Sequence, residues 1–400
     1  MNYYLDKYEY GNTLAEVAPS GKLGIVVVIP CRNDPELLSS LRSLRACSLP
    51  ESDTEVLAIV YHREEPGNTL QVPGNRLEKA CEWSRINSGP RLTFHIISIT
   101  LPAGGDVEMA RQAGMDEGMR RFEQTLRREG IIACYDAGTL CDTNYLQELE
   151  RHFRSHPHTS GSSIYFEHGI EGVQDLMKCE RIVQYELNTR YYINSLRYCR
   201  HPYAHQGIGA GLAVRSSAYK ARKTNASSGK GDLHFLRSLP ETGDFTDINT
   251  TRLIPADPML EEEWHIKAGA SYHNFQVFEE LRAFFNMVDD LYSEESLRNS
   301  LDELPETIRA YFLMHGDFRD TMRQLKHDTY EPEHFRNKFF QWFNTSEILT
   351  YLDFAAEFFF PKTHYDEPLE QLFIKIAPEV SCSTAREYLL HLREREKNGR

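Results

Sequence analysis

The sequence has no long uninterrupted hydrophobic run. No apolar stretch approaches the ~18–20 residues that a membrane-spanning helix needs, although hydrophobic residues make up 40% of the chain. The first ten residues, MNYYLDKYEY, also lack the basic region and the apolar core of a signal peptide. These two absences predict a cytoplasmic protein without a transmembrane segment.

An excess of basic residues is missing as well. Lysine and arginine together number 45 against 59 aspartates and glutamates, which gives a formal net charge of −14. A general nucleic-acid binder would show a strongly basic face, so the composition argues against that class. A local basic pocket for a phosphate-bearing small molecule remains compatible with this charge.

Paired cysteines are absent from the sequence. The eight cysteines contain no C-x-x-C pair, and several of them lie in apolar, strand-like runs. Such cysteines are typical of reduced, buried thiols in a cytosolic protein. The spacing therefore argues against a zinc site.

A dinucleotide-binding turn is also lacking. The first apolar run, LGIVVVIP at 23–30, is followed by CRNDPE and not by Gly-x-Gly-x-x-Gly. Because that turn is what brings the backbone close to a pyrophosphate, its absence excludes a dinucleotide-dependent oxidoreductase.

The first half of the chain alternates apolar runs with helical patterns. Residues 106–130 and 144–156 have the composition of helices, and a third helix is expected to begin at Pro35 with Asn33 or Asp34 as its cap. The predicted strands cover residues 23–30, 54–62, 92–100 and 131–136. This rhythm predicts an α/β fold with a doubly wound, mostly parallel sheet.

Ligands of such sheets bind beyond the carboxyl ends of the strands. The segments that follow the four predicted strands should therefore share one crevice: 30–34, 61–68, 101–111 and 136–142.

The second half of the chain is less regular. Residues 157–274 combine a short strand, a long aromatic-rich helix, a glycine-rich turn that leads into a strand, and polar loops. Residues 275–400 show apolar positions at helical spacing throughout. These helices either bury their own aromatic residues as an all-helical C-terminal domain, or form an acceptor platform or a homodimer interface.

Five short motifs occur in one order along the chain. Pro30, Asn33 and Asp34 end the first strand, Arg111 lies in MARQAGMDEG, and Asp136 begins DAG. The glycine-rich GIGAGLAVR segment at 207–215 and the GKGD segment that ends at Asp232 follow.

This order resembles the family 2 glycosyltransferases of the GT-A fold, in particular bacterial members with a helical C-terminal extension. The resemblance covers roughly residues 23–274 and implies a nucleotide-diphospho-sugar transferase-like domain, with a nucleotide-binding half at 23–156 and an acceptor half at 157–274. Residues 1–22 are then an N-terminal segment and 275–400 a helical domain.

The resemblance implies an enzyme of the hexosyltransferase class. It would transfer a sugar from a nucleoside-diphosphate sugar to a hydroxyl acceptor, with inversion. Asp232 would be the catalytic base, and Asp136 would be the ligand of a divalent metal, Mn²⁺ or Mg²⁺. The implied nucleotide-sugar contacts are Pro30, Arg32, Asn33, Asp34, Arg111, Asp136, Gly209, Gly211, His265 and Lys267.

These roles agree with the chemistry. A departing pyrophosphate needs a cation or basic side chains, and an acceptor hydroxyl needs a base within hydrogen-bond reach.

Most of these residues also have a purely structural interpretation. Asp136 suits a turn, Arg111 suits a solvated helix surface, and Asp232 suits a helix N-cap. The glycine-rich run suits a bulged strand start. His205, just before it, could orient a substrate hydroxyl, but a structural histidine is the favoured interpretation.

The chain departs from the family pattern at three motifs. Gly138 replaces the second acid of Asp-x-Asp, although Thr139 and Asp142 offer other oxygens, and Lys230-Gly231 replaces the Gly-Glu that precedes the base. Three glutamates at 261–263 occupy the loop expected to meet the diphosphate. These changes put metal dependence in doubt. They also support an alternative: a catalytically degenerate homologue that serves as a nucleotide-sugar or protein-binding module.

Overall fold

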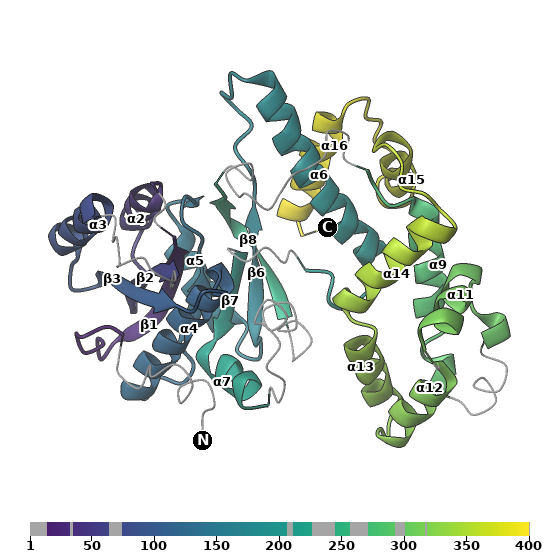
Figure 1. The fold of residues 1–400 in the computed structure, drawn as a ribbon, viewed down its shortest axis with the longest axis horizontal. Helices are drawn as coiled ribbons and strands as arrows, with labels where there is room; N and C mark the ends of the chain where they lie inside the picture. Colours follow the sequence, from purple (N-terminus) through teal and green to yellow (C-terminus); the bar gives the residue numbers. More distant parts are fainter. Residues whose placement is uncertain are drawn as a thin grey trace. The chain divides into compact units, whose positions relative to one another are not determined.

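The computed structural model describes residues 14–32, 35–63, 74–205, 211–225, 245–256, 271–292, 301–316 and 318–399 (Figure 1). The chain forms two compact units. The sheet unit comprises Met1–Gly169, His205–Leu260 and Glu396–Arg400. The helical unit comprises Ile170–Ala204 and Glu261–Arg395.

One mixed sheet organises the sheet unit. Within the described residues its strands follow the order β3-β2-β1-β4-β7-β6-β8-β5. Their bounds are β1 Leu23–Cys31, β2 Asp53–Arg63, β3 Leu92–Leu101, β4 Ile131–Cys134, β5 Leu140–Cys141, β6 Gly161–Phe166, β7 Leu212–Arg215 and β8 Phe245–Ile254. Pairing is parallel among β3, β2, β1 and β4 and between β6 and β8, whereas β7 and β5 run against their neighbours.

Helices cover both faces of this sheet. The apolar residues of β1 alternate between two cores, so that Val27 packs on one face and Val28 on the other. One face carries α2 (Leu37–Arg45), α3 (Gly74–Asn87) and α5 (Tyr145–Ser155). The opposite face carries α4 (Val107–Gln124) and α7 (Ser216–Asn225). The predicted fold class, a doubly wound and mostly parallel sheet followed by helices, is confirmed.

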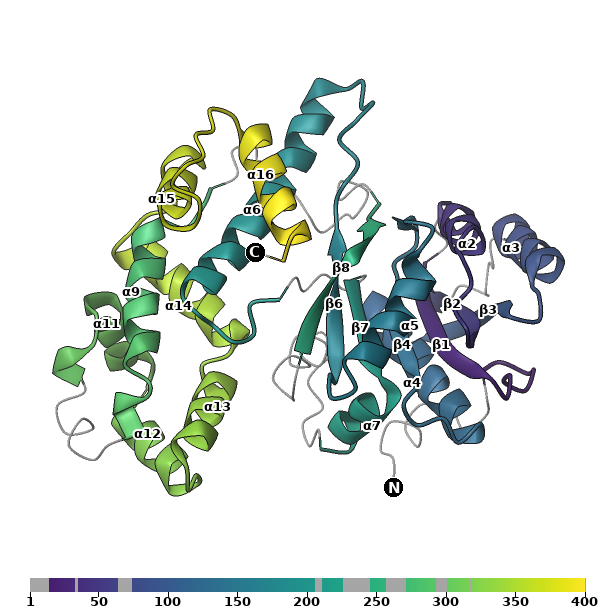
Figure 2. The same ribbon diagram turned by 180° about the vertical axis from the view of Figure 1, so that it is seen from behind.

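The order of the strands reverses beside β1. The chain first builds outward from β1 to β2 and β3, and then returns to place β4 on the other side of β1 (Figure 2). The carboxyl ends of β1 and β4 therefore flank a topological switch point, where open α/β sheets bind ligands. On the other side of β1, the end of β2 and the loop after β3 are directly linked, since Arg63 Nε donates to the carbonyl of Gly105 at 2.6 Å.

Several local predictions need correction. Helix α2 begins at Leu37 with Glu36 as its N-cap residue, two residues later than the start predicted at Pro35. Asn144 is the N-cap residue of α5, as predicted, but its side chain does not cap the helix. It bonds instead to Thr250 and Thr251 of β8. The sequence analysis missed α3.

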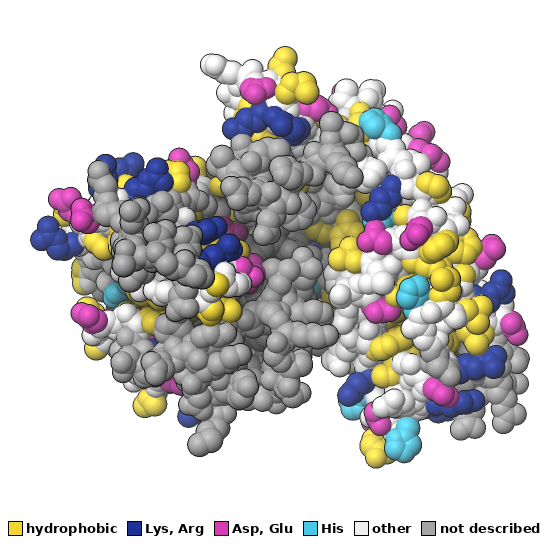
Figure 3. Space-filling view, in the orientation of Figure 1, with side chains coloured by type: hydrophobic (Ala, Val, Ile, Leu, Met, Phe, Trp, Pro, Cys, Tyr) yellow, Lys and Arg dark blue, Asp and Glu magenta, His cyan; other side chains and the backbone are white. Residues whose placement is uncertain are grey.

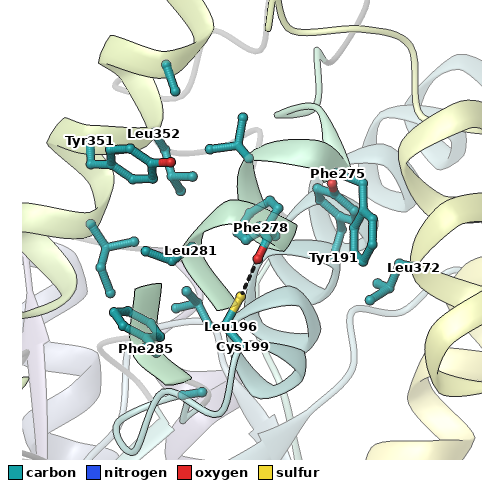
Figure 4. Packing of buried hydrophobic residues seen from close by; sticks show 14 of the residues in the cluster. Tyr191, Leu196, Cys199, Phe275, Phe278, Leu281, Phe285, Tyr351, Leu352 and Leu372 are labelled. Atoms are coloured by element: carbon teal, nitrogen blue, oxygen red, sulfur yellow. Dashed lines mark hydrogen bonds between the residues drawn. The ribbon is translucent and has the colours of Figure 1, made fainter. Parts of the chain in front are cut away.

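The helical unit has its own aromatic core. Its elements are α6 Leu176–Tyr198, α9 Phe275–Asn286, the 3-10 helix η4 Asp290–Tyr292, α11 Glu306–His315, α12 Phe318–His327, α13 Pro332–Trp342, α14 Thr345–Phe358, α15 Asp366–Ile376 and α16 Ala385–Lys397. Figure 4 shows α6 and α9 packed together, with Cys199 Sγ 3.1 Å from the carbonyl oxygen of Phe278. Phe284 and Phe343 are fully buried in the same cluster. This burial supports the interpretation that the C-terminal helices bury their own aromatic residues.

The long aromatic-rich helix α6 packs in this helical core. The sequence analysis assigned it to the acceptor half, 157–274. A functional boundary at residue 274 stays a prediction, because a packing unit and a functional domain need not coincide.

No helix in the described ranges is long and apolar enough to cross a membrane. On the face of the helical unit visible in Figure 3, acidic, basic and hydrophobic side chains are interspersed.

A buried charge cluster joins the two ends of the helical unit. Glu186 of α6 is fully buried and accepts hydrogen bonds from Arg190 Nε at 2.8 Å and from Arg393 Nη2 of α16 at 2.6 Å. A buried carboxylate is costly unless it is paired, and here two guanidinium groups compensate it. The cluster therefore connects residues 207 positions apart in the chain.

We expect the substitution Glu186→Gln to lower the free energy of unfolding of the helical unit by about 3 kcal/mol, because it removes a buried negative charge that two buried guanidinium groups contact. Urea denaturation measures this loss. Glu180→Gln is the matched control, since Glu180 is exposed on the same helix and accepts a hydrogen bond from Gln184. It should change stability by less than about 0.5 kcal/mol. Equal stabilities of the two variants would refute the role of the cluster.

Candidate functional site

Asp136 lies at the switch point. It follows Cys134 and Tyr135 directly beyond the carboxyl end of β4, and Tyr135 N still donates to the carbonyl of Val28 in β1. The side chain of Asp136 is 29% exposed, so its carboxylate remains open to a ligand. A strand end next to the central strand is where the sequence analysis expected this residue.

Arg111 of α4 holds the Asp136 carboxylate. Its Nη2 donates to Asp136 Oδ1 at 2.5 Å, and its Nη1 donates to Glu108 one turn earlier. The Arg111 residue is only 2% exposed. Burial alone would lower the pKa of its guanidinium, but the neighbouring carboxylates of Asp136 and Glu108 outweigh burial and hold the pKa above its usual value. Arg111 is therefore a buried, fully charged partner of Asp136 and not a solvated helix residue.

Helix α2 fixes the loop that follows Asp136. The Gly138 N–H donates to Ser40 Oγ at 2.9 Å, and the same hydroxyl donates to the carbonyl of Thr139 at 2.9 Å. One turn later in α2, Ser43 Oγ accepts from the N–H of Cys141 at 2.9 Å. Two serines on one face of α2 therefore determine the path of the loop from Asp136 to β5.

The backbone explains why glycine stands at position 138. Gly138 has a φ of +87°, which L-residues with a side chain rarely adopt. A Cβ atom at this position would lie 2.8 Å from the Cβ of Ala256 and 3.4 Å from the Cβ of Glu36. A second acid of the Asp-x-Asp type therefore does not fit the turn that this chain forms.

The oxygens near Asp136 do not assemble into a metal site. Asp142, the alternative ligand, pairs with Arg252 Nη2 at 3.1 Å, and Thr139 Oγ1 is buried without a partner. In the part of the chain that the structure describes, no group of three or more His, Cys, Asp or Glu residues is placed to hold a metal ion. Because Arg111 already binds one oxygen of Asp136 and Asp142 is paired with Arg252, the described residues do not fit a resident divalent cation.

A small pocket opens beside the ends of β1 and β2. It has a volume of about 230 Å³ and lies between α2 and α3, lined by Cys31, Pro35, Leu37, Leu38, Val60, His62, Arg76, Leu77, Lys79 and Ala80. Ligand pockets usually measure about 300–1,000 Å³, so this one suits a part of a ligand. His62 Nε2 is buried without a hydrogen-bond partner. The lining thus offers an apolar floor and several nitrogen donors.

A histidine and an aspartate are paired in the second half of the sheet. His205 Nδ1 lies 2.9 Å from Asp247 Oδ1 of β8, and Ser163 Oγ of β6 donates to the same carboxylate oxygen at 2.5 Å. The His205 side chain is 16% exposed. A carboxylate on Nδ1 leaves Nε2 to accept a proton, which is how a histidine base is oriented. The sequence analysis gave His205 a structural role and did not consider Asp247.

The structure describes only part of the predicted site. Pro30 is buried in β1 and pairs with Ile59, and Arg32 is exposed directly after that strand. A Cβ on Gly211 would lie 3.2 Å from the carbonyl oxygen of Ile164, so this glycine allows close strand approach. The predicted residues that lie outside the described ranges are Asn33, Asp34, Gly209, Asp232, His265 and Lys267.

Sequence reasoning missed the pocket donors Arg76 and Lys79, because they lie on the unpredicted helix α3. The signal was present, since Leu77, Ala80 and Trp83 recur at helical spacing.

Comparisons with known proteins give distant structural matches only. No family model matches the sequence, and no curated protein matches it. The crystal structure of S. aureus TarS 1-349 is 12% identical over 94% of this chain and 92% of that chain, with a TM-score of 0.36. Its complex with UDP-GlcNAc gives 13% identity, the same coverage and a TM-score of 0.37. The longer S. aureus TarS structure gives 13% identity over 93% of this chain and 55% of that chain, with a TM-score of 0.34. At these sequence identities and TM-scores, the similarity to the TarS structures gives no information about the fold beyond the strand order.

We expect Gly138→Asp, which restores the family's acidic pair in sequence, to destabilise the protein and to create no metal affinity. Both Gly138→Asp and Gly138→Ala should lower the unfolding free energy by about 1–3 kcal/mol. The reason is that a side chain would be held in the left-handed backbone conformation and its Cβ would press against Ala256. Urea denaturation and calorimetry with Mn²⁺ measure the two effects.

Gly172→Ala is the control that separates the free-energy cost of the left-handed backbone from the cost of the contact with Ala256. Gly172 also has a positive φ, +74°, but nothing lies within 4 Å of its Cβ position. Its variant should show the backbone cost alone. A stable Gly138→Asp variant that binds Mn²⁺ would overturn this account of the missing acid.

Proposed function

We propose that the sheet unit binds a nucleoside-diphosphate sugar and transfers the sugar to a hydroxyl acceptor. The observation that carries the proposal is the placement of Asp136 at the switch point, held by the buried Arg111. The order of the five sequence motifs supports the same reaction. Asp136 and Arg111 come from two of these motifs, 25 residues apart, and they meet at this site.

Asp136 would serve as an acceptor for hydroxyl groups of the donor. One carboxylate oxygen is bound by Arg111, and the side chain keeps an exposed fraction of 29%. Because the guanidinium fixes the carboxylate, a sugar or ribose hydroxyl meets an oriented acceptor and little ordering cost is paid on binding. This role does not require a metal ion.

The pocket between α2 and α3 would receive the base of the donor. Its apolar floor accommodates a flat ring, and the unpartnered His62 Nε2 offers a hydrogen-bonding atom at its edge. The pocket opens beside the carboxyl end of β1, the strand adjacent to β4. A donor extended between the pocket and Asp136 would therefore cross the switch point.

The acceptor hydroxyl needs a base, and two candidates exist. Asp232 is the base that the family resemblance implies. The His205–Asp247 pair is the second, because its geometry leaves His205 Nε2 able to take a proton. The strand pairings align Ala133 of β4, through β7 and β6, with Thr246 of β8. Three strand spacings separate these two residues, which is about 14 Å. Asp247 is the next residue after Thr246.

One observation favours the alternative, a nucleotide-sugar-binding module without transferase activity. The positive φ of Gly138 and the nearness of Ala256 to its Cβ position leave no space for a second acid, and Asp142 is paired with Arg252. A site that lost its metal oxygens could keep donor binding and lose catalysis, since a fold can host a changed function.

Calorimetric titration with UDP, GDP and dTDP sugars, including UDP-GlcNAc, tests donor binding. We expect micromolar affinity that is the same with EDTA as with Mg²⁺ or Mn²⁺. Asp136→Asn should weaken binding about 10- to 100-fold, because a hydrogen bond to a charged group contributes about 1.5–3 kcal/mol. Asp142→Asn is the matched control and should bind normally. Binding that requires a metal would contradict the role of Arg111, and no binding at all would remove the proposal.

Variants of the two candidate bases separate catalysis from binding. If His205 is the base, His205→Asn lowers kcat by about 10²- to 10⁴-fold with little change in donor affinity. Asp232→Asn should show this pattern if the family assignment holds. Normal donor binding without sugar transfer in the unmodified protein would establish the binding-module alternative.

A further inference from the structure

Two cysteines from distant parts of the sheet unit lie in contact. Cys47 follows the C-terminus of α2, and Cys141 ends β5, 94 residues later. Their Sγ atoms are 3.5 Å apart. Cys47 is 6% exposed, whereas Cys141 is partly exposed and therefore accessible to a small reagent.

Hydrogen bonds fix the two backbones side by side. Ser43 Oγ accepts from the N–H of Cys141 at 2.9 Å, and the N–H of Ser48 donates to the carbonyl of Thr143 at 2.7 Å. These bonds lie on both sides of the sulfur pair. The contact between the thiols is therefore built into the packing of α2 against β5.

We propose that Cys47 and Cys141 form a reversible disulfide that ties the end of α2 to the loop carrying Asp136. A disulfide needs an S–S distance of about 2.05 Å, so the sulfurs must approach by about 1.5 Å. β5 is a two-residue edge strand paired only with β8 among the described strands, and such a short element can supply this shift.

The surroundings favour attack by Cys141. Cys141 is the partly exposed member of the pair, so a disulfide in solution reaches its sulfur first. Cys47 is buried and lies 3.5 Å from that sulfur. Cys47 is thus placed to act as the resolving thiol.

The reaction needs a small disulfide as oxidant. The Cys141 thiolate attacks one sulfur of oxidised glutathione, forms a mixed disulfide and releases one glutathione thiolate. In the mixed disulfide Cys141 is uncharged. The Cys47 thiol then loses its proton to solvent. Cys47 attacks the Cys141 sulfur and expels the second glutathione thiolate. Two protein thiols are oxidised, and one glutathione disulfide is reduced to two thiols.

Oxidation would act on the proposed donor site. Cys141 lies five residues beyond Asp136, and Ser40 and Ser43 already bind the intervening loop to α2. A covalent link at the end of this loop would fix its path and change nucleotide affinity. This last step rests on the proposed function, whereas formation of the disulfide does not.

Treatment of the full chain with oxidised glutathione, followed by peptide mass spectrometry without reduction, tests the proposal. We expect a Cys47–Cys141 cross-linked peptide as the main product, reversed by dithiothreitol. Cross-linking should raise the Tm of the sheet unit by about 5 °C or more. The Cys47→Ser and Cys47→Ala variants should instead retain glutathione on Cys141, because the resolving thiol is gone.

Cys81→Ser is the matched control, since Cys81 is exposed and unpaired by this geometry. It should leave the cross-link unchanged. Glutathione on Cys81 without any Cys47–Cys141 peptide in the unmodified chain would overturn the proposal. A cross-link that forms while no nucleotide sugar binds would confirm the disulfide and reject the donor site separately.

Discussion

The buried guanidinium of Arg111 is the constraint on which the candidate site depends. A charged group with 2% exposure requires close compensation, and Asp136 and Glu108 supply it from β4 and α4. The pair fixes the register of α4 against the carboxyl end of β4 and holds Asp136 in one orientation. The serines of α2 then bind the following loop, so two helices on opposite faces of the sheet position one partly exposed carboxylate.

The sheet could be predicted because its strands carry a local signal. The run at 23–30 is too apolar for a half-exposed strand, and β1 is indeed buried on both faces. The helices α4 and α5 were also foreseen. The ends of α5 lie within one residue of the prediction, whereas α4 ends at Gln124, six residues before the predicted end. Residues of α7 were not recognised as helical, because SSAYKARKTN follows directly on the apolar β7 run and carries few apolar residues to mark a buried face. The antiparallel insertion of β7 between β4 and β6 depends on pairing between distant segments, which no local pattern encodes.

The site was less predictable, because its contacts join residues far apart in sequence. Asp136 and Arg111 were both named from motifs, but the ion pair between them depends on how α4 packs against β4. Gly138 looked like a lost ligand; the structure adds that its positive φ and the nearness of Ala256, 118 residues later, disfavour any side chain there. The His205–Asp247 pair also spans a long insertion. Contacts between residues so far apart in the chain follow from the tertiary fold, and the spacing of residues in the sequence does not reveal them.

The charges at the switch point decide where a diphosphate could lie. Arg111 offers one positive charge against the carboxylates of Asp136 and Glu108, which leaves the cluster with a net charge near −1. Like charges about 4 Å apart repel by about 1–4 kcal/mol between water and the protein surface. The phosphates must therefore lie away from Asp136 and close to other cations. The exposed Arg32 at the end of β1 and the pocket residues Arg76 and Lys79 are the described candidates on the side of β1 away from β4. Under the proposed function, Asp136 would therefore contact hydroxyl groups of the ligand, and basic side chains would contact its phosphates.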